Sequence, residues 1–247
     1  MYRLLKRWGI PLLSPRRPDI TIIRLIEYLK NWKTYSGLEK SGSIKLLDTQ
    51  PELFDNSKTT LFDYHYVYQS TWALEQIQIN SPYFHVDIGS QIQFVASVAV
   101  FVPTIFLDIR PVYSKIKGMT SIAGNILNSP FTDGTIASIS CLHVAEHIGL
   151  GRYGDQINPK GTELACKELK RILSAGGNLY FSVPVGKPKI RFNAHRIHSI
   201  KQILDYFDGL KLIHLSAVMD NGDFVLNPDL SELDSQEYAC GLFWFRK

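Results

Sequence analysis

The amino-acid sequence predicts an α/β fold: a mostly parallel sheet of seven strands, with one antiparallel strand, preceded by a helical extension. From residue 84 onward, short apolar runs alternate with helical patterns, as in successive strand–helix–strand units. Two of these runs end in aspartates, Asp87 and Asp108. Residues 19–79 carry helical or irregular patterns instead. We therefore expect a helical extension or lid over residues 1–80 and an α/β domain over residues 81–247.

Composition narrows the class of protein. Of the 247 residues, 45% are hydrophobic, which is enough for a packed core, and the net charge of +4 is too mild to predict a nucleic-acid partner. The three cysteines, Cys141, Cys166 and Cys240, form no CxxC pair. We therefore expect neither a metal site nor disulfides, and a cytoplasmic location. No apolar run reaches the roughly 18 residues that would indicate a membrane span.

The first 18 residues are basic. They contain no acidic residue and lack the apolar region of a secretory signal. We expect either a weak peripheral contact with an anionic membrane surface or a solvated basic tail. The basic residues are Arg3, Lys6, Arg7, Arg16 and Arg17. The sequence predicts no oligomeric state.

Two helices are expected before residue 80. Asp19 is a candidate N-cap for the first, whose apolar face includes Ile20, Ile23 and Ile26. A polar stretch over residues 36–60 indicates a connector. The second helix is expected over Tyr64–Ile79, ending before Asn80-Ser-Pro82.

The remaining elements follow from apolar runs of strand length and from longer helical periods. The expected strands are Phe84–Ile88, Thr104–Asp108, Thr120–Ala123, Ile136–Cys141, Gly177–Val183, Leu210–Val218 and Tyr238–Arg246. The expected helices are Ile92–Phe101, Pro159–Leu173 and Ser199–Phe207. Residues 220–236 are expected to form a loop. Because this loop is too short for a usual helical crossover, the last strand is expected to return antiparallel.

The two aspartate-ended strands indicate a ligand site. In an α/β sheet a ligand lies across the carboxyl ends of neighbouring strands. Gly89 follows Asp87 and lets the backbone approach a ligand closely, while the Asp108 carboxylate can accept both hydroxyls of a ribose. We therefore expect a nucleoside-containing cofactor. Two structural alternatives stay open: Asp87 as a cap of the following helix, and Asp108 as an ion-pair partner of Arg110.

Several blocks in order resemble the class I S-adenosylmethionine-dependent methyltransferases. They are Val86-Asp-Ile-Gly89, Leu107-Asp-Ile109, residues 124–131, residues 133–140, His143-Val-Ala-Glu-His147, and the stretch from Glu168 to Pro184. The resemblance covers residues 84–186 and implies a Rossmann-like fold with S-adenosyl-L-methionine as cofactor. The residues that it implies for cofactor binding are Asp87, Gly89, Ser90, Asp108, Ile109, Asn125, Ile126 and His143.

Over its whole length the chain also resembles an uncharacterised bacterial family related to these methyltransferases. The blocks that carry this resemblance are Phe62-Asp-Tyr-His-Tyr66 with Gln69 and Trp72, Asp108-Ile-Arg-Pro111, Phe192-Asn-Ala-His-Arg196, and Cys240-Gly-Leu-Phe-Trp-Phe-Arg246. Members of that family are often associated with surface-glycan (polysaccharide) biosynthesis. The resemblance therefore implies an O-methyltransferase acting on a small-molecule or glycan acceptor, namely a sugar or sugar-linked intermediate.

One departure from the methyltransferase pattern concerns the first loop. Gly89 is followed by Ser90-Gln91-Ile92-Gln93, so the further glycines usual at this point are missing. A dinucleotide needs those glycines for its pyrophosphate, whereas S-adenosylmethionine has no phosphate. Methyl transfer is therefore favoured over an NAD-dependent or nucleotide-sugar enzyme. A non-catalytic protein that binds S-adenosylmethionine is the other alternative.

Candidate catalytic and acceptor-binding residues surround this site. Histidines and carboxylates near the expected acceptor position can take a proton from it; the candidates are His143, His147, Glu146 and His65. The candidates for acceptor binding are Tyr66, Tyr153, His195 and Arg196. Structural alternatives stay open: Glu146 and His147 as anchors of a loop, His65 and Tyr66 in a packing helix, and His195 and Arg196 in a surface loop.

Overall fold

The computed structural model describes residues 18–38 and 44–247, so the expected membrane or solvent role of the basic N-terminus lies outside the described residues. The described chain separates into two compact units with a boundary between Leu61 and Phe62.

Among its described residues, the first unit contains one long helix. Helix α2 spans Pro18–Leu38, and a short 3-10 helix, η1, spans Leu46–Asp48. The helix includes Asp19 rather than beginning after it, so the expected N-cap position is wrong. Arg24 donates a hydrogen bond to the carbonyl of Asn56 at 2.9 Å, which ties the helix to the connector.

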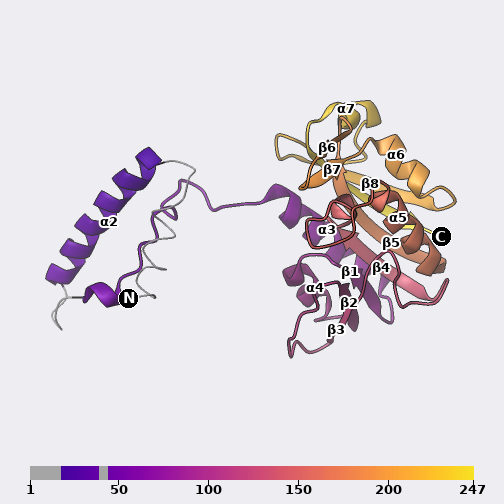
Figure 1. Ribbon diagram of the computed structural model, residues 1–247, viewed down its shortest axis with the longest axis horizontal. Helices are drawn as coiled ribbons and strands as arrows, with labels where there is room; N and C mark the ends of the chain where they lie inside the picture. Colours follow the sequence, from indigo (N-terminus) through magenta and orange to yellow (C-terminus); the bar gives the residue numbers. More distant parts are fainter. Residues whose placement is uncertain (1–17, 39–43) are drawn as a thin grey trace. The chain divides into compact units, whose positions relative to one another are not determined.

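The second unit is built on an eight-stranded sheet (Figure 1). Its strands are β1 (His85–Ile88), β2 (Thr104–Asp108), β3 (Met119–Ala123), β4 (Ile136–Leu142), β5 (Leu173–Val185), β8 (Lys211–Val218), β9 (Phe224–Leu226) and β10 (Ala239–Arg246). The spatial order is β3-β2-β1-β4-β5-β10-β8-β9. Strands β1 to β5 pair in parallel, and β10 runs antiparallel to both β5 and β8.

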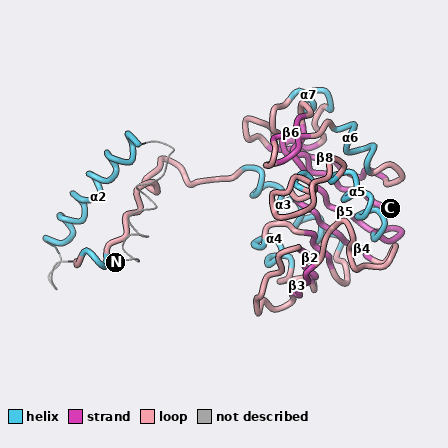
Figure 2. The backbone as a smooth tube through the Cα atoms, viewed as in Figure 1, coloured by secondary structure: helices cyan, strands magenta, loops and turns pink. Residues whose placement is uncertain are grey.

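Helices cover both faces of this sheet, as Figure 2 shows. They are α3 (Tyr64–Asn80), α4 (Ile92–Val98), η2 (Ala145–His147), α5 (Gly161–Ile172), α6 (Ile200–Tyr206) and α7 (Leu230–Ser235). Apolar residues of α3 and α4 form a buried cluster on one face, and those of α5 and α6 form a larger cluster on the other. This two-layered burial confirms the expected Rossmann-like α/β fold.

Three features differ from the expectations. Residues 220–236, expected to be a loop, contain β9 and α7. A small hairpin, β6 (Lys189–Arg191) with β7 (His195–Ile197), follows β5. Helix α3 belongs to the compact unit that begins at Phe62, because it packs its buried residues into the sheet cluster; the boundary therefore lies before this helix and not near residue 80.

A buried polar ladder crosses the centre of the sheet. His85 and Asp87 of β1 lie opposite Ser138 and Ser140 of β4, and all four side chains are buried. The His85 ring nitrogens lie 2.8 Å from the two serine hydroxyls, and the Ser140 hydroxyl donates to Asp87. Since that hydroxyl donates to Asp87, its oxygen accepts from Nε2–H of His85. The Nδ1 atom of His85 then accepts from Ser138.

The strand order reverses between β1 and β4, because β2 and β3 follow on one side and β5 on the other. In such sheets the crevice at this point, outside the carboxyl ends of the strands, is where ligands bind. In the part of the chain that the structure describes, no helix is both long and apolar enough to cross a membrane.

Candidate active site

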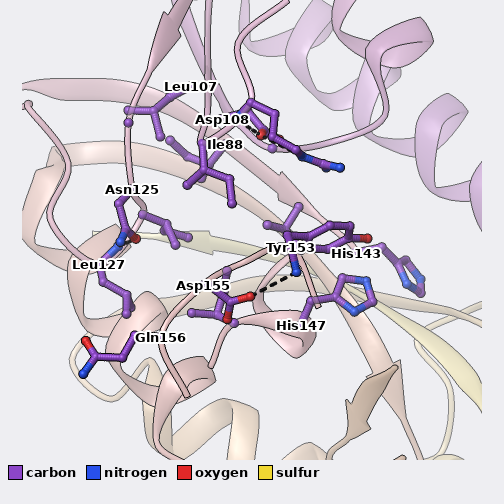
Figure 3. Close-up of a pocket in the computed structure, with 17 residues that line it drawn as sticks. Ile88, Leu107, Asp108, Asn125, Leu127, His143, His147, Tyr153, Asp155 and Gln156 are labelled. Carbon is purple, nitrogen blue, oxygen red and sulfur yellow. Dashed lines mark hydrogen bonds and ion pairs between the residues drawn. The ribbon is translucent and has the colours of Figure 1, made fainter. Parts of the chain in front are cut away.

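A two-part groove lies at this crevice, and Figure 3 shows its first part. The residues that line the first part are Ile88, Gly89, Leu107, Asp108, Ile109, Arg110, Gly124, Asn125, Ile126, Leu127, His143, Val144, His147, Ile148, Tyr153, Asp155 and Gln156. The second part adjoins the first along Gly89, Asp108 and His143, and extends to Tyr66 and Ser90. The groove thus brings most of the expected cofactor residues together with four of the expected catalytic and acceptor residues, His143, His147, Tyr66 and Tyr153.

The loop after β1 is shaped by a buried carboxylate. Asp87 accepts a hydrogen bond from the backbone N–H of Ser90 at 2.9 Å, and the Ser90 hydroxyl accepts from the N–H of Leu142 at 3.0 Å. Gly89 has φ of 67°, and a Cβ there would come within 3.1 Å of Val144 Cγ1. Asp87 itself is absent from the residues that line either part of the groove, so it acts on a ligand only through the loop that it holds.

Burial dominates the electrostatics of Asp87. It raises the pKa of this carboxyl to about 6, although hydrogen bonds from Ser140 and Ser90 work in the opposite direction. The expected capping role is partly realised: Asp87 accepts from the loop, whereas α4 begins later, after Gln91, without a side-chain cap.

Asp108 at the end of β2 faces both parts of the groove. Its Oδ1 accepts from the backbone N–H of Arg110 at 2.6 Å and lies 3.7 Å from Arg110 Nε. The expected ion pair with Arg110 is therefore present, but it uses one oxygen. The other, Oδ2, has no hydrogen-bond partner among the described residues and is available to a ligand.

An apolar wall with one amide closes the far end of the first part. Ile126 is buried, Ile109 is half exposed, and the Asn125 side chain accepts from the N–H of Leu127 at 2.9 Å. Such a surface can hold a flat aromatic base between apolar side chains.

Helix α5 holds this wall in place through Glu168 and Arg171, which together form the Glu168 clamp. The Glu168 carboxylate accepts from the N–H of Ser129 at 3.0 Å and from its hydroxyl at 2.8 Å. Arg171 pairs with Glu168 at 2.6 Å, donates to the carbonyl of Phe131 at 2.8 Å, and also pairs with Asp133. Hydrogen bonds from Arg171 lower the pKa of Glu168 to about 2. The sequence alone gave no indication of this clamp.

His143 follows β4 with φ of 54°, an unusual backbone for a residue that carries a side chain. Its Nδ1 lies 2.9 Å from Glu146 Oε1, and its Nε2 lies 3.2 Å from Cys240 Sγ. Burial lowers the pKa of His143, but Cys240 and the Glu146 carboxylate outweigh it and raise the pKa well above its ordinary value. Both ring nitrogens are engaged, so in this arrangement His143 is not a free base.

Glu146 is fully buried, and neither carboxylate oxygen makes a hydrogen bond of regular geometry. Its only close charged neighbours among the described residues are His143 and His147, the latter at 3.7 Å. Burial raises the pKa of Glu146, but the interaction with His143 prevails and lowers it. The carboxylate does not line the groove and therefore cannot touch an acceptor there.

His147 lines both parts of the groove. Its Nδ1 lies 2.6 Å from the carbonyl of Ala194, which requires Nδ1 to carry the proton. Nε2 is then the nitrogen that can accept a proton from an acceptor. Of the four expected catalytic residues, His147 has the placement best suited to a base.

Tyr153 lies across the groove between the sides that carry Asp108 and His147 (Figure 3). The Arg110 guanidinium lies 4.3 Å from the centre of its ring, and the His147 ring meets it edge-on at 5.7 Å. Asp155 holds the surrounding loop, because its carboxylate accepts from the N–H groups of Gly149, Gly151 and Tyr153 at 2.6, 3.4 and 3.2 Å. The loop that carries Tyr153 is therefore held by its own hydrogen bonds, and Asp155 is a residue that sequence reasoning missed.

His65 and Tyr66 come from the first turn of α3, which Asp63 caps by accepting from the N–H of Tyr66. Tyr66 lines the second part of the groove, while His65 lies behind it, with its ring 5.5 Å from that of His143. Burial, followed by the effect of His143, lowers the pKa of His65 to about 4. The helix that carries them packs against the sheet and is not a separate lid.

His195 and Arg196 lie on β7 outside the lining of the groove. Arg196 is buried, and its Nη1 and Nη2 donate to the carbonyls of Ile148 and Asn158 at 2.6 and 3.0 Å, so these donors bind backbone and not an acceptor. His195 packs its ring 4.8 Å from Tyr238. Arg196 does not lie in a surface loop either. It is buried and holds the backbone of the loop beside the groove.

A family model described as "Caenorhabditis protein of unknown function, DUF268" matches residues 91–236. No curated protein matches the chain.

Solved structures share the fold at low sequence identity. The N-methyltransferase NodS from Bradyrhizobium japonicum, in complex with S-adenosyl-L-homocysteine, has a TM-score of 0.50 at 13% identity, over 80% of this chain and 91% of that one. The 1,6-didemethyltoxoflavin-N1-methyltransferase from Burkholderia thailandensis, with bound S-adenosylhomocysteine, has 0.51 at 11%, over 72% and 78%. The [4+2]-cyclase SpnF has 0.52 at 11%, over 73% and 80%. These likenesses show that the chain shares the Rossmann-like α/β fold of these proteins.

Proposed function

The chain belongs to the DUF268 family. We propose that it is an S-adenosylmethionine-dependent methyltransferase. The observation that carries the proposal is the Asp108 carboxylate. One oxygen is bound by Arg110 and the other is open to the groove, between the Gly89 loop and the apolar wall of Ile109 and Ile126. A nucleoside fits this arrangement, with its ribose hydroxyls on Asp108 and its base against the wall.

The first loop favours this cofactor over a dinucleotide. Gly89 gives close backbone approach, but Ser90 is tied to Leu142 and Asp87, and side chains stand where a pyrophosphate would require bare backbone. A sulfonium cofactor brings positive charge and no phosphate. The carboxylates near the loop suit a cation and oppose an anion.

The reaction would be displacement at the cofactor methyl group by an acceptor oxygen. The oxygen–methyl bond forms as the sulfur–methyl bond breaks, and S-adenosylhomocysteine leaves. Alignment of acceptor and methyl in the groove would supply most of the rate, and Nε2 of His147 would take the acceptor proton. Tyr66, Tyr153 and Arg110 give the groove aromatic faces and a cation, which suit a hydroxylated acceptor such as a sugar or sugar-linked intermediate of surface-glycan biosynthesis.

Cofactor binding is tested by titration calorimetry of the full chain with S-adenosylmethionine and with NAD. We expect binding of the first and not of the second. Asp108→Ala should weaken binding by about 1–3 kcal/mol, because it removes charge-assisted hydrogen bonds to the ribose. Asp205→Ala is the control, since this exposed carboxylate pairs with Lys201 on α6. Equal affinity of the two variants would remove Asp108 from the site.

Turnover needs a separate measurement, because SpnF has this fold and is described as a cyclase. Transfer of a labelled methyl group from S-adenosylmethionine to a pool of sugar-linked acceptors is expected. Binding without transfer to any acceptor would favour the non-catalytic alternative, and NAD binding would favour a hydride-transfer or nucleotide-sugar enzyme.

A further inference from the structure

Three metal-ligand side chains converge behind the groove. The donor atoms of His65, His143 and Cys240 all lie within 4.8 Å of one another. They come from the first turn of α3, the residue after β4 and the second residue of β10. Because β10 runs antiparallel to β5, its first residues lie at the same sheet edge as the carboxyl ends of β4 and β5. Topology, and not a sequence motif, assembles this cluster.

The spacing of the donors fits a small tetrahedral ion. With metal–nitrogen bonds of about 2.0 Å and metal–sulfur bonds of about 2.3 Å, the ligand atoms of a tetrahedral zinc site stand about 3.3–3.6 Å apart. His143 Nε2 lies 3.2 Å from Cys240 Sγ, close to such an edge. His65 completes a triangular face after a shift of about 1 Å, which rotation of its side chain can supply.

Glu146 is an independent observation that points to a cation. This carboxylate is fully buried, its oxygens lack regular hydrogen bonds, and Oε1 lies 2.9 Å from His143 Nδ1. Histidine ligands commonly give their second ring nitrogen to a carboxylate, which directs the other nitrogen to the metal. A divalent ion together with the Cys240 thiolate and the Glu146 carboxylate would make a buried cluster without net charge, in which the ion takes the place of the proton on His143.

We propose that His65, His143 and Cys240 bind a zinc ion, with Glu146 as the carboxylate behind His143 and a fourth coordination position left to an exogenous ligand. A mixed set of imidazoles and one thiolate is a zinc donor set, and three protein ligands are typical of catalytic zinc. His65 and Tyr238 also line a separate surface pocket, which gives an access route for the ion.

The function of this ion would lie in acceptor activation. His143 belongs to the cluster and also lines both parts of the groove, so an acceptor hydroxyl or thiol that reached the fourth position would lose its proton more readily. This role rests on the proposed methyl transfer, whereas metal binding itself does not depend on it.

The test begins with metal content. The full chain, purified without a histidine tag and dialysed against zinc at fixed free concentration, should retain one zinc per chain by mass spectrometry. Replacement by cobalt should give thiolate-to-cobalt charge-transfer absorption in the near ultraviolet. Cys240→Ser should abolish that absorption and lower zinc affinity, whereas Cys166→Ser, a buried cysteine on α5, should change neither.

Two further variants separate coordination from general loss of structure. His65→Gln changes a partly exposed residue on a helix surface and should lower zinc affinity while circular dichroism stays unchanged. Glu146→Gln should keep the cobalt absorption and weaken zinc binding by roughly 10–100-fold. Calorimetry with S-adenosylmethionine on the same samples reports on the cofactor site alone. Absence of bound zinc in the wild-type chain, or equal loss in Cys166→Ser and Cys240→Ser, would overturn the metal site whatever the cofactor result.

Discussion

At the residue scale, Ser140 joins two buried ionisable groups whose pKa values burial shifts in opposite directions. Burial lowers the pKa of His85 to about 3 and raises that of Asp87 to about 6. Burial therefore favours the neutral form of both groups, so at neutral pH His85 is neutral, whereas Asp87 is a carboxylate that takes up a proton below about pH 6. The ladder can be buried in the sheet because its hydrogen bonds replace those to water.

These two residues should make opposite contributions to acid stability. Between pH 6.5 and pH 3 the unfolded chain protonates His85 and the folded protein does not, so the free energy of unfolding falls as pH decreases, by up to roughly 5 kcal/mol. Between pH 6 and pH 4 the folded protein protonates Asp87 before the unfolded chain does, so that contribution rises as pH decreases.

His85→Gln keeps an amide that can bond to both serines but removes the titration. In urea unfolding followed by circular dichroism, the variant should lose less stability than the wild type as pH falls from 6 to 4, because the His85 contribution is removed while those of Asp87 and of the other groups, such as His65, remain. Asp87→Asn is the matched control and should steepen the acid loss of stability. Identical pH profiles for the two variants and the wild type would contradict the assignment of these pKa shifts.

At the element scale, α5 holds the apolar wall of the groove through one glutamate. Glu168 binds Ser129 by its N–H and its hydroxyl, so the position of residues 124–131 depends on a helix that does not line the groove. Such indirect support determines how well a binding wall is preorganised.

Glu168→Gln should therefore weaken S-adenosylmethionine binding several-fold with little loss of helix, because the amide keeps the side-chain volume but loses the charged acceptor. Glu163→Gln, an exposed residue in the first turn of α5, is the control. Calorimetry at neutral pH measures both. Unchanged affinity in Glu168→Gln would show that the wall does not need this clamp.

The sequence predicted the elements with long apolar patterns and missed those that tertiary pairing creates. The strands that carry Asp87 and Asp108 were predicted because most of their residues are apolar and they are bounded by turn signals. Strand β9, Phe224–Leu226, is too short to have a period and exists through its pairing with β8. Cys240, the Asp155 brace and the Glu168 clamp were missed because each depends on partners distant in the sheet or loop, which no local spacing reveals.

At the scale of the whole molecule, the site belongs entirely to the unit that begins at Phe62. Every residue that lines the groove, and every residue of the proposed zinc site, lies in this unit. Its two apolar clusters are built from its own elements, including α3. A unit with a complete core of its own is expected to fold independently.

A chain of residues 62–247 should therefore unfold in one cooperative transition and bind S-adenosylmethionine with the affinity of the full chain. Thermal unfolding followed by circular dichroism, together with calorimetry, checks both properties. A start at residue 81 is the informative comparison, because it removes the buried side chains of α3 and should leave a protein that unfolds without cooperativity. A folded 81–247 protein with full affinity would place the boundary where the sequence first indicated it.

The ladder of His85 and Asp87 against Ser138 and Ser140 also constrains how the sheet can assemble. Side chains alternate across a strand, so a slip of β1 by one residue along β4 would turn its polar side chains into the apolar layer beneath α5. Val86 and Ile88 would then face hydroxyls that they cannot satisfy. Purely apolar parallel strands carry no such penalty, and for them neighbouring registers are close in energy. The four polar side chains therefore select one pairing of the central strands, and with it the alignment of the loops that form the groove.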